Sequence, residues 1–196
     1  VSVHGANRLG GNSLLETIVF GARSAKHACD YIKESGDARP SERTLKNEQD
    51  RIDRWLSKNT GARAPQLRAQ MNKTMSENVF IFRNEKELKQ AVDDLLEIRK
   101  AFDRDVYVMD KSKTFNTDLV HVMEVDFLID AAMCVANGAL ARKESRGAQA
   151  RTDYPERDDE NWMMHTLAWR QRNENPRLDY SRKVTITKWQ PQVRSY

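Results

Sequence analysis

The residues best placed to do chemistry lie in the first turn of the chain, where glycines 5, 10 and 11 surround Arg8. Glycine has no Cβ, so a backbone rich in it can approach a ligand closely. The turn leads into an expected helix, whose N-terminus carries partial positive charge and unpaired N–H groups. Arg8 adds a planar guanidinium suited to a carboxylate or a phosphate. These features allow an anion site, but spacing alone favours a structural glycine loop with a surface arginine, because the dinucleotide fingerprint G-x-G-x-x-G is not present here.

The other titratable residues favour structural roles. Three acids of one expected helix are interpreted as pointing to different faces, and no histidine clusters with them, so solvation or ion pairing is expected rather than metal binding: Glu124, Asp126 and Asp130. Hydrogen-bonded structural roles are expected for the four histidines, which are His4, His27, His121 and His165. The two cysteines are far apart and are expected to be small buried hydrophobes: Cys29 and Cys134.

Composition excludes several classes of protein. The net charge of +4 comes from 33 basic and 29 acidic residues, scattered along the chain. Nucleic-acid binders usually gather basic residues on one face, so no nucleic-acid partner is expected. The mean hydropathy is −0.79, and no apolar run approaches the roughly 20 residues of a membrane helix. Any contact with a membrane is therefore expected to run through other subunits.

The elements that must hold the opening turn divide into three sections. Residues 1–36 contain the turn and one helix, with Ser13 and Glu16 predicted to form a capping box and Gly36 to end the helix. Residues 37–143 carry apolar residues at helical spacing, interrupted by breakers at Gly61 and Pro65. Helices are predicted at about 41–60, 65–79, 84–102 and 116–143, the last one buried and central.

Short loops between these helices predict a mostly α fold with a small antiparallel helical bundle. Residues 144–196 differ, because prolines interrupt them and three of the four tryptophans lie there. Only Val184–Thr187 has the pattern of a strand. An irregular tail is therefore expected, with aromatic residues that the rest of the chain or a partner subunit must cover.

Two runs of sequence resemble the flavoprotein subunit of succinate dehydrogenase and fumarate reductase. Residues 4–21 read HGANRLGGNSLLETIVFG, close to the family's H-G-A-N-R-L-G-x-N-S-L-L-[DE]-x-[VI]-V-F-G. Residues 145–155 read SRGAQARTDYP, close to the family's S-R-G-A-H-x-R-x-D-[FY]-P, and 157–162 and 165–167 continue the match. The resemblance implies that the chain is the C-terminal portion of such a subunit. Residues 1–36 would then be a remnant of the FAD-binding domain, and 37–143 the family's helical domain.

The resemblance assigns roles residue by residue. Arg8 matches the arginine that binds a carboxylate of the dicarboxylate substrate, and Ser13 and Leu14 match residues that contact FAD. No catalytic residue and no metal ligand is expected within this sequence, because the family's glycine fingerprint and proton-transferring arginine lie upstream. Gln149 departs from the family, which usually has histidine there, so proton chemistry in this loop is not expected.

The function implied is that of an FAD-dependent oxidoreductase that interconverts succinate and fumarate and passes electrons to an iron–sulfur subunit. The chain by itself is expected to be inactive. The implied location is cytoplasmic, on the inner face of the membrane through partner subunits. Two alternatives stay open from the sequence: a flavoprotein of the L-aspartate oxidase type, and, for the isolated chain, a non-catalytic helical module that docks other subunits.

Overall fold

The computed structural model describes residues 3–36, 39, 41–171, 173–184, 188, 190 and 192. Within them the fold is mostly helical, as predicted, with two pairs of very short strands. One pair is parallel and the other antiparallel, β1 with β2 and β3 with β4. The elements are α1 (Asn12–Ser35), α2 (Glu42–Ser57), α3 (Ala64–Asn78), β1 (Phe82–Arg83), α4 (Glu85–Asp105), α5 (Thr117–Ala141), β2 (Ala150–Arg151), α6 (Asp159–Trp162), β3 (Leu167–Trp169) and β4 (Arg177–Asp179).

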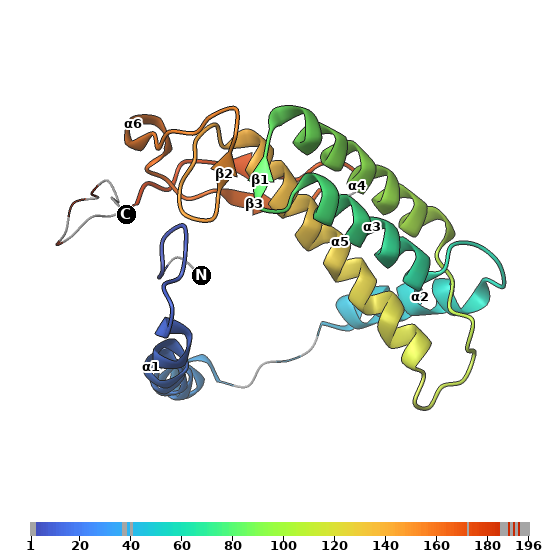
Figure 1. Cartoon of the computed structure of the whole chain (residues 1–196). Coiled ribbons are helices and arrows are strands. Elements are labelled where there is room, and N and C mark those ends of the chain that lie inside the picture. Colours follow the sequence, from blue (N-terminus) through green and yellow to red (C-terminus); the bar gives the residue numbers. More distant parts are fainter. Residues whose placement is uncertain are drawn as a thin grey trace.

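The centre of the molecule is a bundle of α3, α4 and α5, with α2 at one end (Figure 1). Local signals set the helix starts: the Asn84 side chain accepts from the Glu87 N–H at 3.0 Å, and the Asn116 side chain from the Leu119 N–H at 2.8 Å. The apolar positions predicted from helical spacing form one core, except Leu45 of α2, which is exposed. Trp55 of α2 joins the core by an edge-to-face contact with Phe102. The helical bundle is thus confirmed.

Helix α5 is less enclosed than its sequence suggests. Eight of its residues are buried against α3 and α4. Its other side stays exposed, including Phe127, whose surface is 58% accessible, as well as Val120 and Val135. The prediction of a helix buried on nearly all sides is therefore wrong for one face, because α3 and α4 pack against only one side of α5.

Helix α1 lies apart from the bundle (Figure 1). None of its 24 residues, all of which the structure describes, is buried, and Cys29 is exposed rather than buried as expected. Gly36 ends the helix, as predicted. The predicted capping box is wrong: the N-cap is Gly11, with a φ of 80°, and no side chain caps the helix there.

The C-terminal section has more order than an irregular tail, because charged side chains organise it. Glu144 is fully buried and accepts from Arg142 at 2.6 Å, from Arg146 at 2.9 Å and from the Asp158 N–H at 2.9 Å. Arg142 also donates to the carbonyls of residues 162 and 164. All four strands went unpredicted, and residues 185–187 of the one that was predicted lie outside the described residues.

The Arg151–Asp153 pair joins two helix ends. Arg151 is buried and donates to the carbonyls of Ala139 and Leu140 at the end of α5, both at 3.1 Å. Asp153 accepts from Arg151 at 2.7 and 2.8 Å and from the Glu85 N–H, at the start of α4, at 2.8 Å. A cation at a helix C-terminus and an anion at a helix N-terminus both favour the folded state.

We expect this pair to make stability depend on pH. The hydrogen bonds from Arg151, helped by the Glu85 N–H, lower the pKa of Asp153 from 3.8 to about 2. A carboxylate with a depressed pKa stabilises the fold above its unfolded pKa and loses this contribution as pH falls from about 4 to 2. Asp153→Asn should cost on the order of 1 kcal/mol at pH 7, given partial solvent screening. Urea titrations of both proteins between pH 7 and pH 2 should show the difference disappear; a difference that persists at pH 2 would contradict this.

Candidate functional site

The opening turn presents its groups outward. Gly5 and Gly11 have φ values of 63° and 80°, and a Cβ built at glycine 5, 10 or 11 would meet no atom within 4 Å. The space in front of the turn is therefore open to a ligand. Arg8 is exposed, and its guanidinium donates to the neighbouring Leu9 carbonyl at 3.4 Å.

The two residues predicted to contact a cofactor lie in the first turn of α1. Ser13 and Leu14 follow Asn12, the first helical residue, and both are exposed, Leu14 with 72% of its surface accessible. The Asn12 N–H donates to the Leu9 carbonyl at 3.4 Å, and because no side chain caps this helix, the N–H groups that follow it in the first turn can face a ligand. Arg8, Ser13 and Leu14 thus share one exposed end of the chain, as their spacing predicts.

His4 closes the turn onto the helix. Its Nε2 lies 2.6 Å from Oε2 of Glu16, and this hydrogen bond lowers the pKa of the Glu16 carboxyl. The bond ties the residue before Gly5 to the second turn of α1. The prediction of a hydrogen-bonded structural histidine is confirmed at His4. Its partner is Glu16, which the sequence had predicted to pair with Ser13 in a capping box.

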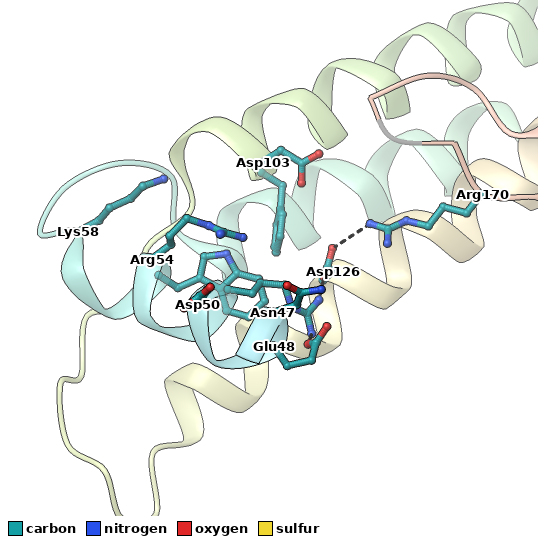
Figure 2. A pocket seen from close by; sticks show the side chains of 11 residues that line it. Asn47, Glu48, Asp50, Arg54, Lys58, Asp103, Asp126 and Arg170 are labelled. Atoms are coloured by element: carbon teal, nitrogen blue, oxygen red, sulfur yellow. Dashed lines mark hydrogen bonds and ion pairs between the residues drawn. The ribbon is translucent and has the colours of Figure 1, made fainter. Parts of the chain in front are cut away.

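A mixed-charge pocket lies between α2, α4 and α5 (Figure 2). Its volume is about 680 Å³, and one of its lining residues is Asp126, which is only 3% accessible. Asp126 binds Arg99 at 2.7 Å and Arg51 at 2.6 Å, and Arg170 lies 3.9 Å away. Arg99 is held charged here: burial acts to lower its pKa, but Asp103 and Asp126 outweigh burial and raise it.

The neighbouring Asp130 shares this cluster of charges. Burial raises the pKa of its carboxyl, opposed by Arg170, whose Nε lies 2.7 Å from it. The expectation of ion-paired acids is confirmed for Asp126 and Asp130, but they share a face of α5 rather than pointing apart. Among the described residues no group of acids, histidines and cysteines could hold a metal ion. The charged residues of this pocket therefore form ion pairs that hold α2 against the bundle.

The two sequence runs singled out above meet in space. The backbone N–H of Ala148 donates to the Ala6 carbonyl at 3.2 Å, so a loop of the C-terminal section contacts the opening turn. Gln149, the departure from the family pattern, accepts from Arg83 and donates to the Ala139 carbonyl at 3.0 Å. Its side chain thus ties the loop to the end of α5. Sequence reasoning missed this contact, for which neither run carries a local signal.

The chain thus combines a helical bundle with a preceding exposed glycine turn and an uncovered helix. A family profile described as "Fumarate reductase flavoprotein C-term" matches residues 68–196. The chain belongs to this family.

Curated relatives extend the similarity over the whole chain. The succinate dehydrogenase flavoprotein subunit of Rickettsia bellii is 41% identical over 196 residues, which are 100% of this chain and 33% of that protein. The fumarate reductase flavoprotein subunit of Haemophilus influenzae is 38% identical over 99% of this chain and 32% of its own length. The chain therefore spans about a third of the length of these relatives.

Solved structures of proteins from the same family also superpose on this chain. A variant of the E. coli quinol fumarate reductase superposes with a TM-score of 0.90 at 36% identity, covering 98% of this chain and 33% of that one. The Sdh1 complex of Mycobacterium smegmatis superposes with a TM-score of 0.78 at 31% identity, over 94% and 32% of the two chains. No helix within the described residues is long and apolar enough to cross a membrane.

Proposed function

We propose that this chain is the substrate-side end of a longer flavoprotein, here called the parent, which interconverts succinate and fumarate. The observation that carries the proposal is the exposed turn at residues 4–12, where Arg8 stands beside an uncapped helix N-terminus. Relatives named for succinate dehydrogenase and for fumarate reductase both match the chain. The proposal therefore covers the interconversion of succinate and fumarate and does not assign the direction in which the parent works.

In this proposal Arg8 binds one carboxylate of the dicarboxylate through the two parallel donors of its guanidinium. The first N–H groups of α1, with Ser13 and Leu14, contact the edge of the isoalloxazine ring of FAD. When bound, FAD supplies the hydride chemistry. The chain's own groups fit this contact, because the glycines leave the approach open and the helix N-terminus stabilises negative charge that develops there.

Residues 1–36 are proposed to belong to the FAD-binding domain of the parent, residues 37–143 to be its helical domain, and residues 144–196 to contact another subunit. Support comes from burial: the core begins at Trp55 and ends at Ala139, whereas α1 keeps its apolar face uncovered. The proposed partner is an iron–sulfur subunit that takes electrons onward, and the proposed place is the inner face of the membrane, reached through other subunits.

The test is a substrate comparison with the parent. The purified full-length protein with FAD is expected to reduce a dye with succinate, or to oxidise a reduced dye with fumarate, and to leave L-aspartate unchanged. Turnover of aspartate with no turnover of either dicarboxylate would refute the proposal. The 196-residue chain alone is expected to bind FAD weakly in a fluorescence titration, because the site proposed here supplies only one side of the flavin.

A further inference from the structure

The loop at residues 146–149 is a tight hairpin turn. Arg146 and Gln149 exchange backbone hydrogen bonds of 2.7 and 3.0 Å, which leaves Gly147 and Ala148 at its tip. Gly147 has a φ of 58°, a conformation that glycine adopts freely and that the first central residue of a type II′ turn requires. This geometry turns the Ala148 N–H outward, toward the opening turn.

The tip presses closely on the backbone of the opening turn. A Cβ at Gly147 would lie 2.8 Å from both the carbonyl carbon and the oxygen of Ala6, and 2.9 Å from its Cβ. Contacts this short with backbone atoms cannot form unless one of the two segments moves. The hydrogen bond from Ala148 to the Ala6 carbonyl, 3.2 Å long, therefore depends on glycine at position 147.

The base of the loop is rigid. Arg146 is held by the buried Glu144 and by Asp159, at 2.6 Å, and Arg151 is held by the end of α5. Because the loop is fixed to the end of α5 and contacts Ala6, it fixes the opening turn relative to the bundle. On the other side of that turn, the His4–Glu16 hydrogen bond holds it to α1.

Arg8 lies only two residues beyond Ala6. Among the described residues, its guanidinium donates to the adjacent Leu9 carbonyl at 3.4 Å, a backbone acceptor of the same turn, so the backbone of the turn sets where it stands. A shift of the turn by a fraction of an ångström would move the guanidinium with it. Misplacement of about 1 Å can cost on the order of 100-fold in rate.

We propose that Gly147 and Ala148 are positioning residues for the dicarboxylate site: their loop braces the opening turn so that Arg8 meets the substrate carboxylate. The inference rests on the function proposed above for Arg8. It adds that the helical part of the chain takes part in substrate binding, through a backbone contact that any side chain at position 147 would disturb.

The experiment uses the full-length parent with FAD and compares Gly147→Ala with Gly36→Ala. Gly36 has nearly the same φ, 66°, yet a Cβ there meets nothing within 4 Å, so this control carries the backbone strain without the close contact. Gly147→Ala should weaken binding of the unreactive dicarboxylate malonate and raise KM for succinate by about 10-fold or more. Gly36→Ala should leave both within about twofold, although its backbone strain should also lower the melting temperature.

A double-mutant cycle asks whether the effect passes through Arg8. In an Arg8→Ala background, Gly147→Ala should lower malonate affinity by less than about twofold. An equal loss with and without Arg8 would overturn the proposal, and so would Gly147→Ala behaving like Gly36→Ala.

The Arg8→Ala variant tests the proposed function independently of the positioning role of Gly147. Arg8→Ala with unchanged malonate affinity would refute the role of Arg8, whereas a large loss there beside a normal Gly147→Ala protein would refute only the brace. If Gly147→Ala does not fold, Ala6→Val enlarges the other side of the same contact without a positive φ, and it is held to the same outcomes.

Discussion

Arg8→Ala in the full-length parent is expected to lower kcat/KM for succinate or fumarate by about 1,000-fold. The side chain is exposed at the tip of the turn, and its two parallel donors fit a carboxylate. Losing it removes charge-assisted hydrogen bonds and the alignment of the substrate, effects that are each worth on the order of 100-fold or more. Steady-state kinetics with both dicarboxylates measure the loss.

Arg23→Ala is the matched control. Arg23 is a second exposed arginine at this end of the chain, and its guanidinium lies over the Phe20 ring at 5.8 Å. Removing it should leave kcat/KM within about twofold, because exposed charges contribute little individually. Arg8→Lys should recover part of the loss, since it restores the charge but not the two parallel donors. Near-normal turnover by Arg8→Ala would show that this arginine does not bind the substrate.

Much of the helical fold could be predicted because its signals are local. Asn84 and Asn116 cap the helices that they precede, and Gly36 ends the first one. Apolar residues at helical spacing gave the core of α3 and α4. Each of these signals is complete within one or two turns of helix, so a sequence window contains it.

What could not be predicted depends on residues far apart in sequence. Ser13 and Glu16 have the spacing of a capping box, yet Glu16 binds His4 across the turn, because a histidine within reach competes for the carboxylate. The parallel pairing of β1 with β2 joins residues 82–83 to 150–151, and two residues on each side are too few to show a periodicity.

The candidate site was predicted in part. The glycines and Arg8 indicated an open turn at a helix N-terminus, and resemblance named Ser13 and Leu14; all three residues lie together on the exposed end. The supporting loop was not foreseen. No sequence signal singles out Gly147, and the structure shows that Ala6 occupies the space that a side chain there would need.

The largest stability effect is expected at Glu144. Its carboxylate is fully buried and receives hydrogen bonds from Arg142, Arg146 and the Asp158 N–H. Glu144→Ala would leave two guanidinium groups without their shared anion in a poorly solvated site. Removing one partner from a buried charge cluster costs about 3–5 kcal/mol, so the C-terminal section should detach from the bundle at low urea concentrations.

Urea unfolding of the chain, followed by circular dichroism and tryptophan fluorescence, measures this loss. Glu160→Ala is the matched control, because it removes the same side chain from an exposed position nearby and should cost less than about 0.5 kcal/mol. Trp162 stacks on Arg142, with 5.1 Å between the guanidinium carbon and the ring, so its fluorescence should change in Glu144→Ala before helicity falls. Equal unfolding midpoints for the two variants would mean that the buried cluster contributes no more than a surface charge. The loop that positions Arg8 would then be held to α5 mainly by Gln149 and Arg151, which both donate to the Ala139 carbonyl.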